Sequence, residues 1–153
     1  MSERRLLVVY HSQGGNVERM TEAVVRGARR EEGVAVRAVL AKDAGLDDLL
    51  WAEALLLGTP ENFGYMSGAL KDFFDRTFYP AQGKVVGLPY AIFVKAGNDG
   101  TGAVTSIERI ARGYPLKAVA DPLVVRGELS DADLAACEEL GQTIAAALAL
   151  GMY

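Results

Sequence analysis

A glycine-rich segment near the start of the chain could hold an anionic group with its backbone. Residues 12–17, Ser-Gln-Gly-Gly-Asn-Val, join a short apolar run to an amphipathic one. Glycine lets a backbone approach a ligand closely, and the first turn of a helix offers unpaired N–H groups at the positive end of its dipole. Because the segment contains no Lys or Arg, we expect its amides and the side chains of Ser12 and Asn16 to bind a phosphate without an ion pair.

Two adjacent glycines also suit a plain tight turn between a strand and a helix, and this segment alone leaves both interpretations open. It lacks the Gly-Lys-Ser or Gly-Lys-Thr ending of a nucleoside-triphosphate loop and the Gly-x-Gly-x-x-Gly spacing of a dinucleotide fold. A phosphorylation receiver domain is also excluded, because its first strand would end in acidic residues that bind magnesium, whereas this one ends in His11-Ser12.

A second segment could border a flat ring. Residues 58–68 read Gly-Thr-Pro-Glu-Asn-Phe-Gly-Tyr-Met-Ser-Gly and follow another apolar run. Pro60 and Gly64 restrict the path of this loop, so that its amides can reach the polar edge of a ring. Phe63 or Tyr65 can cover an apolar face. The alternative is that both aromatic side chains only pack the loop onto the rest of the domain.

The third segment, residues 96–102, is also rich in glycine and follows a further apolar run. Its amides and the side chains of Asn98 and Asp99 could contact the other side of the same ring. Glycines after a strand are common, however, and Asp99-Gly100 is also typical of an ordinary turn.

Apolar runs and amphipathic segments alternate along the whole chain. The apolar runs predict strands at residues 6–10, 34–39, 54–57, 90–94 and 116–125. Helical periodicity predicts helices over residues 17–28, 46–51, 67–79, 104–111 and 131–148.

Capping and breaking residues set the expected ends of these elements. Ser67 and Ser130 are good N-caps, the second with the spacing of a capping box. We expect Gly33 to stop the first helix and Pro80 to end the third. Pro122, within the last strand, indicates an edge position or a break.

Strict alternation of strands and helices predicts an α/β fold with a doubly wound parallel sheet. Ligands of such sheets bind outside the carboxyl ends of the strands, where the strand order reverses. The three segments follow the first, third and fourth strands, so we expect them at that one edge. No repeat or linker interrupts the chain, which predicts a single domain over residues 1–153.

Composition excludes several classes of function. The 153 residues carry 16 basic and 20 acidic side chains, a formal charge of −4, and this argues against nucleic acid and anionic membranes as partners. No apolar run reaches the roughly 20 residues of a membrane span, and we expect no membrane insertion. One Cys and one His leave little material for a disulfide or a metal site, so we expect no metal and a cytoplasmic protein.

The segments together resemble a known superfamily. Residues 10–17, Tyr-His-Ser-Gln-Gly-Gly-Asn-Val, are similar to the FMN-phosphate loop of flavodoxin-like proteins. Flavodoxins proper usually have hydroxyl residues where this chain has Gly14 and Val17. The run from Gly58 to Gly68 closely resembles the Gly-Thr-Pro, Phe-Gly-x-Met-Ser-Gly segment of the tryptophan-repressor-binding-protein type of NAD(P)H:quinone reductase, in which an aliphatic residue is tolerated at the position of Val17.

This resemblance implies a three-layer sandwich whose five parallel strands have the order 2-1-3-4-5. It also implies FMN as cofactor and flavin-borne chemistry without a catalytic residue. The cofactor-binding residues that it predicts are Ser12, Gln13, Gly14, Gly15, Asn16 and Val17 in the first segment, Thr59, Pro60, Glu61, Asn62, Phe63, Gly64 and Tyr65 in the second, and Ala96, Gly97, Asn98 and Asp99 in the third.

Three functions remain open at this level. The resemblance favours an FMN-dependent oxidoreductase that takes electrons from NAD(P)H and passes them to quinones or similar small acceptors. The second is a flavodoxin-like carrier between protein partners, although the modest charge of −4 is less acidic than a docking surface usually requires. The third is an interaction module that has lost its cofactor. Relatives in the quinone-reductase group are often oligomers, and we expect a homodimer.

Overall fold

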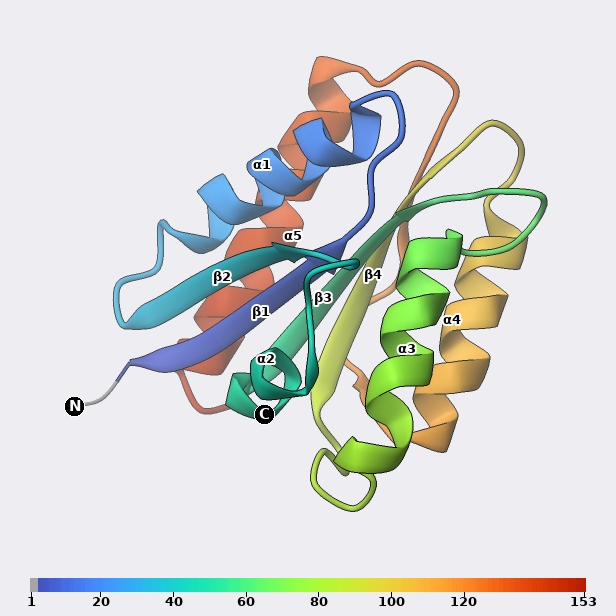
Figure 1. Ribbon diagram of the computed structural model, residues 1–153. Helices are drawn as coiled ribbons and strands as arrows, with labels where there is room; N and C mark the ends of the chain where they lie inside the picture. The colour runs from blue at the N-terminus through green and yellow to red at the C-terminus, as the bar shows by residue number, and fades with distance from the viewer. Residues whose placement is uncertain (1–2) are drawn as a thin grey trace.

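The computed structural model describes residues 3–153, which form a parallel sheet covered by helices on both faces (Figure 1). Its strands are β1 (Arg4–Tyr10), β2 (Val34–Leu40), β3 (Ala54–Pro60), β4 (Pro89–Ala96), β5 (Lys117–Ala118) and β6 (Leu123–Arg126). Its helices are α1 (Asn16–Ala28), α2 (Leu46–Trp51), α3 (Gly68–Ala81), α4 (Thr101–Gly113) and α5 (Asp131–Ala149).

The sheet has the strand order β2-β1-β3-β4-β5, and every recorded pairing is parallel. The chain passes from β1 outward to β2 and then crosses back to β3, so the strand order reverses between β1 and β3. The predicted doubly wound sheet and its order are therefore confirmed.

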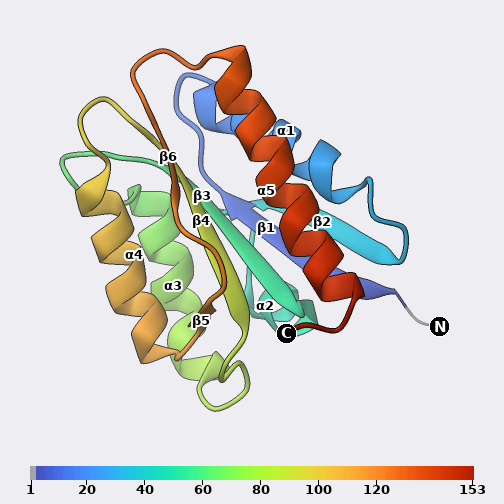
Figure 2. The ribbon, with the colours of Figure 1, turned by 180° about the vertical axis from the view of Figure 1, so that it is seen from behind.

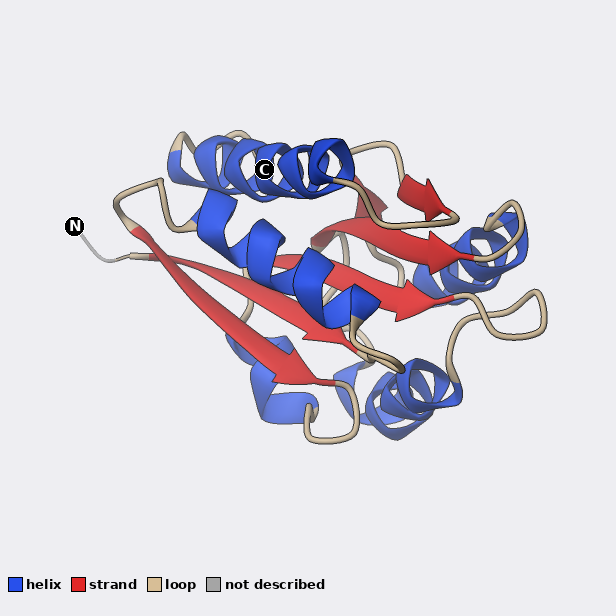
Figure 3. Cartoon of the chain, turned by 90° about the horizontal axis from the view of Figure 1, so that it is seen from above, coloured by secondary structure: helices blue, strands red, loops and turns tan. Residues whose placement is uncertain are grey.

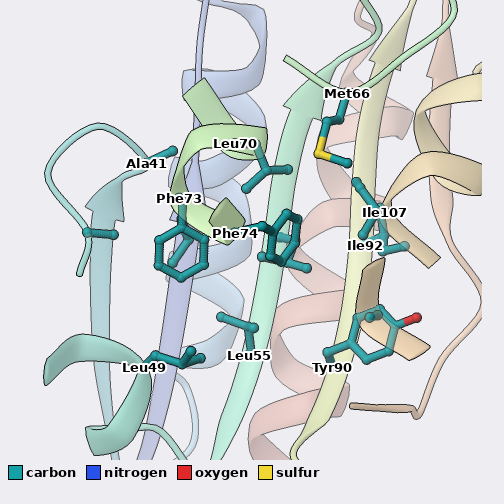
Figure 4. Close-up of a cluster of buried hydrophobic side chains, with 14 of the residues drawn as sticks. Ala41, Leu49, Leu55, Met66, Leu70, Phe73, Phe74, Tyr90, Ile92 and Ile107 are labelled. Atoms are coloured by element: carbon teal, nitrogen blue, oxygen red, sulfur yellow. The ribbon is translucent and has the colours of Figure 1, made fainter. Parts of the chain in front are cut away.

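Helices lie on both faces of the sheet (Figure 3), and an apolar cluster on each face holds the three layers together. Successive side chains of a strand point to opposite faces. Leu7 and Val9 of β1 accordingly pack in the cluster under α2, α3 and α4, whereas Leu6 and Val8 pack in the cluster under α1 and α5. Figure 4 shows the first cluster, in which Phe74 of α3 lies beside the strands. This arrangement explains why the central strands are apolar on both faces.

Helices α1 and α5 lie side by side on one face of the sheet (Figure 2) and cross at two glycines. A Cβ on Gly27 of α1 would lie 1.9 Å from the carbonyl oxygen of Glu138 in α5. A Cβ on Gly141 of α5 would lie 2.0 Å from the carbonyl oxygen of Val24 in α1. The two backbones are therefore in direct contact, and a side chain at either glycine would push them apart.

The last strand differs from the prediction, because it is split in two. Both β5 and β6 pair with β4, and the chain leaves the ladder over residues 120–122, after Val119 N has donated to the carbonyl of Tyr90 at 3.0 Å. Pro122 has no N–H to donate to β4, which accounts for a break at this position.

Two helix ends also differ from the prediction. Helix α1 ends at Ala28, not at Gly33; with φ 82°, Gly33 instead turns the chain into β2, and its carbonyl accepts a hydrogen bond from Arg4 N at 2.9 Å. Pro80 lies inside α3, which continues to Ala81. A proline so close to the end of a helix removes only one helical hydrogen bond, and α3 tolerates it there.

Candidate functional site

Three loops follow neighbouring strands and lie together at the carboxyl edge of the sheet (Figures 1 and 3). We call residues 11–15 loop 1, residues 61–67 loop 2 and residues 97–100 loop 3. Tyr10 at the end of β1 lies opposite Gly58 of β3, and Pro60 at the end of β3 lies opposite Lys95 of β4. The strands therefore end at nearly the same level, and the structure brings the three predicted segments to one edge.

Loop 1 forms an open cradle of backbone amides. Gly14 and Gly15 have φ 74° and 90°, and a Cβ on either glycine would meet no atom within 4 Å. This backbone is left-handed, which glycine adopts without strain. Gly15 caps α1 without a side-chain hydrogen bond, and the hydroxyl of Ser12 accepts the N–H of Glu18 at 3.1 Å.

The amides of residues 13–17 have no hydrogen-bond partner within residues 3–153. They lie at the start of α1, where the helix dipole favours an anion. Uncharged donors in such a concavity fit a phosphate group, so this donor set fits the phosphate of FMN. Val17 can contribute only its N–H, because its side chain is buried between α1 and the sheet.

Loop 2 is a tight hairpin with an exposed aromatic residue at its tip. Asn62 and Tyr65 exchange two backbone hydrogen bonds of 2.9 and 3.0 Å. Phe63 and Gly64 between them have φ 53° and 70°, as in a type I′ turn. Phe63 is fully exposed and is a non-glycine residue in left-handed backbone, which costs about 1–2 kcal/mol. Such strain is typical of functional loops.

A side-chain hydrogen bond ties loop 2 to loop 1. Nδ2 of Asn62 donates to Oε1 of Gln13 at 2.9 Å. The amide cradle and the hairpin are thereby held at a fixed separation, as a ligand with a phosphate at one end and a ring at the other requires.

In loop 2 and the end of β3, the predicted contact residues Thr59 and Glu61 also use their side chains within the protein. The hydroxyl of Thr59 is buried, donates to the carbonyl of Pro60 at 2.7 Å and accepts Ser67 N at 2.9 Å. The carboxylate of Glu61 accepts the amide of Ala103 in the first turn of α4 at 3.2 Å. Both side chains therefore set the path of loop 2, and their backbones are the parts left to contact a ligand.

Loop 3 leads into α4 on the other side of the hairpin. Oδ1 of Asp99 accepts the amide of Thr101 at 2.9 Å, so this side chain closes a turn just before α4, whose N-cap is Gly100. Ala96 is the last residue of β4 and is buried, whereas Gly97 and Asn98 are exposed. Gly97 and Asn98 therefore present polar groups at the surface, as does the second carboxylate oxygen of Asp99, which is also exposed.

A fourth loop at this edge escaped the sequence prediction. Residues 127–130 follow β6, which pairs with β4, and Gly127 N donates to the carbonyl of Ala96 at 3.1 Å. Nε of Arg126 donates to the carbonyl of Asp99 at 3.1 Å, which brings a cation to loop 3. The sequence pattern predicted one strand over residues 116–125. It therefore did not reveal the separate pairing of β6 with β4 that brings Arg126 to loop 3.

Two weakly acidic groups, the phenol of Tyr10 and the thiol of Cys137, stay protonated at neutral pH. Partial burial, with further contributions from Glu18 and Glu22, raises the pKa of Tyr10 above 10.0, so this phenol stays a hydrogen-bond donor beside loop 1. Burial raises the pKa of Cys137 to about 11, which keeps this thiol protonated in the apolar cluster beneath α5.

Two kinds of feature are absent from residues 3–153. None of their helices combines the length and the apolar character that crossing a bilayer demands. Nor do three or more His, Cys, Asp or Glu side chains gather there in a way that could hold a metal ion.

Comparisons with known sequences agree with this geometry. A family model described as NADPH-dependent FMN reductase matches residues 43–120, about half of the chain. A flavodoxin of Aquifex aeolicus is 32% identical over 157 residues, which cover 92% of this chain and 85% of that protein. Two quinone dehydrogenases also match. An NAD(P)H dehydrogenase (quinone) of Acidithiobacillus ferrooxidans is 36% identical over 124 residues, or 67% of this chain. A protein of the same name from Paracoccus denitrificans is 32% identical over 123 residues, again 67% of this chain. The matches span 62% and 59% of these two dehydrogenases, less than two thirds of their lengths.

Solved structures show the same fold. A flavodoxin from the domain Archaea superposes with a TM-score of 0.82 at 29% identity, covering 94% of this chain and 98% of that one. A flavodoxin, WrbA-like protein from Agrobacterium tumefaciens superposes with a TM-score of 0.78 at 24% identity, covering 95% and 98% of the two chains.

Proposed function

The chain belongs to the flavodoxin-like superfamily, and on this premise we propose that it binds FMN and transfers electrons from NAD(P)H to quinones or similar small acceptors. One observation carries the proposal: the unpartnered amides of residues 13–17 lie beside a hairpin that exposes Phe63 and Tyr65. The first suits the phosphate of a flavin mononucleotide, and the second suits its ring.

The residues divide the binding of the cofactor between them. The amides of residues 13–17 would hold the phosphate, and the hairpin of residues 62–65 would border the ring. Gly97 and Asn98 of loop 3 would contact the ring from its other side. When bound, FMN supplies the hydride and electron chemistry, and the protein supplies position and access.

The access of a small acceptor to the expected ring position favours an enzyme over an electron carrier. Phe63 packs against nothing in the described chain, so the tip of the hairpin offers a planar acceptor an apolar surface next to the ring. The names of the two quinone dehydrogenases support the same acceptor class, with NAD(P)H as the donor.

The test has two stages. Saturating FMN should raise the melting temperature of the purified apoprotein, because a ligand that binds only the folded state stabilises it. FMN-loaded protein should then oxidise NADH or NADPH in the presence of a benzoquinone or naphthoquinone. An unchanged melting temperature would refute the cofactor site, and absence of turnover with both donors and every soluble quinone would refute the reductase activity.

A flavodoxin-like electron carrier is the second candidate, favoured by the 32% identity to a flavodoxin over most of both chains. It predicts that photoreduced protein passes electrons rapidly to a haem or iron–sulfur protein while reacting slowly with NAD(P)H. Stopped-flow measurement of both half-reactions on the same sample distinguishes the two candidates.

A further inference from the structure

A groove between α3 and α4 begins at the hairpin of loop 2. It consists of two hollows of about 360 Å³ each, which share Arg109 and Ile110 as lining residues. The first hollow is bounded at one end by Gly64 and Tyr65. The second reaches Phe78 and Tyr79 near the end of α3. Figures 1 and 2 both show α3 and α4 side by side along this course.

The groove is joined to the candidate site through the hairpin itself. A Cβ on Gly102 would lie 1.9 Å from the carbonyl oxygen of Gly64, so the hairpin rests directly on the first turn of α4. The same hairpin is bonded to loop 1 through Asn62 and Gln13. A ligand lying in the groove would therefore have one end beside the loops that we assign to FMN.

Aromatic side chains line both ends of the groove. Tyr65, at the hairpin end, is 41% exposed, and Tyr79, at the far end, is 78% exposed. Phe78 supports Tyr79 edge to face, with ring centroids 5.1 Å apart. Exposed rings of this kind stack against flat heterocycles.

A cation without a partner lies between these ends. Within the part of the chain that the structure describes, the guanidinium of Arg109 has neither an ion pair nor a hydrogen bond, whereas Lys71 across the groove is paired with Asp75 at 2.7 Å. Thr105, one helical turn before Arg109, adds a hydroxyl to the same wall. A guanidinium with all its donors available is the preferred partner of phosphate oxygens.

The order of these groups matches a ligand with two flat rings joined by an anionic linker. The α4 wall runs from Gly102 to Gly113, a rise of roughly 16 Å at 1.5 Å per residue. We propose that this groove binds the pyridine dinucleotide donor, with the diphosphate at Arg109, the adenine at Tyr79 and the nicotinamide end at Tyr65. This assignment rests on the proposed function, which requires a donor of this class.

The test measures binding separately from turnover. ADP-ribose, which has the adenine and the diphosphate but cannot be oxidised, is titrated calorimetrically into FMN-loaded wild-type protein, Arg109→Gln and the control Arg112→Gln. Arg112 is also exposed and lies on the same helix, but it does not line the groove. We expect Arg109→Gln to raise the Kd for ADP-ribose about five- to tenfold, because a charge-assisted hydrogen bond is lost, and Arg112→Gln to leave it within about twofold.

Kinetics provide the second measurement. Arg109→Gln should raise the KM for the dinucleotide by a similar factor with kcat and the Kd for FMN unchanged, as expected for loss of binding that is equal in ground and transition states. Equal ADP-ribose affinity in wild type and Arg109→Gln, or no binding to wild type, would overturn the assignment. A second copy of the chain covering the groove would overturn the assignment as well. Analytical ultracentrifugation would then show a dimer, and Tyr79→Ser would dissociate it.

Failure of this assignment and failure of the reductase activity give different results. Arg109-dependent ADP-ribose binding without any NAD(P)H oxidation would support the groove and refute the activity. Quinone-dependent oxidation with an unchanged KM in Arg109→Gln would refute the groove and leave the activity standing.

Discussion

The side-chain amide of Asn62 donates a hydrogen bond to Oε1 of Gln13 at 2.9 Å, although 49 positions separate the two residues in the chain. It links the hairpin of loop 2 to the amide cradle of loop 1. Because the two loops contact opposite ends of the proposed cofactor, this bond should orient them before FMN arrives.

The first prediction concerns this bond. Asn62→Ala and Gln13→Ala should each raise the Kd for FMN about three- to tenfold, and a double-mutant cycle should give a coupling energy of about 1 kcal/mol. Flavin fluorescence quenching measures the four affinities. Gln82→Ala, which removes an exposed amide just after α3, is the control and should bind FMN like wild type. Strictly additive losses in the double variant would show that the bond has no role in cofactor binding.

The second prediction concerns the strained tip of the hairpin. Phe63 has φ 53° and is fully exposed, so Phe63→Asn should raise the free energy of unfolding by about 0.5–1 kcal/mol, because Asn adopts left-handed backbone more readily. Phe63→Val should lower it, since a β-branched residue fits this backbone poorly. Urea denaturation of the apoprotein measures both. The affinity for FMN should fall in both variants. A loss of FMN affinity in Phe63→Asn, despite its higher stability, would show that the Phe63 ring contributes to cofactor binding.

The third prediction concerns the contact between α1 and α5. Helix propensity alone would favour Gly141→Ala by about 1 kcal/mol. However, the new Cβ would lie 2.0 Å from the carbonyl oxygen of Val24, and overpacking of this kind costs about 1–3 kcal/mol. We therefore expect a net loss of stability in thermal denaturation. Gly68→Ala is the matched control, because a Cβ on that helical glycine meets no atom within 4 Å. Equal melting temperatures for the two variants would contradict the close crossing.

The fourth prediction concerns acid stability. Hydrogen bonds from Arg30 and then Arg26 lower the pKa of Glu138 below its ordinary value of 4.5. A carboxylate with a depressed folded-state pKa adds stability above the unfolded value and loses it as the pH falls through the folded value. Glu138→Gln should therefore melt below wild type at about pH 7, and the difference should close as the pH falls below about 4.5. A difference that stays constant with pH would indicate that the substitution acts through packing.

The sequence was sufficient for most of the elements and for the edge of the sheet at which the three candidate segments lie. The apolar pattern of residues 6–10 requires a strand buried on both faces, and the periodicity of residues 17–28 requires a helix with one buried side. Once strands and helices alternate, the parallel sheet places the loops after the first, third and fourth strands at one edge. Local pattern decides these features, because each depends on residues that are close together in the chain.

Only the tertiary structure decided which groups remain free to bind. Thr59 and Glu61 belong to the predicted segment, yet their side chains are committed to Ser67 and to the first turn of α4. The Asn62–Gln13 bond and the groove at Arg109 likewise depend on distances between residues from different elements. Periodicity reports which face of an element is buried, but it carries no information about the partner on the other side.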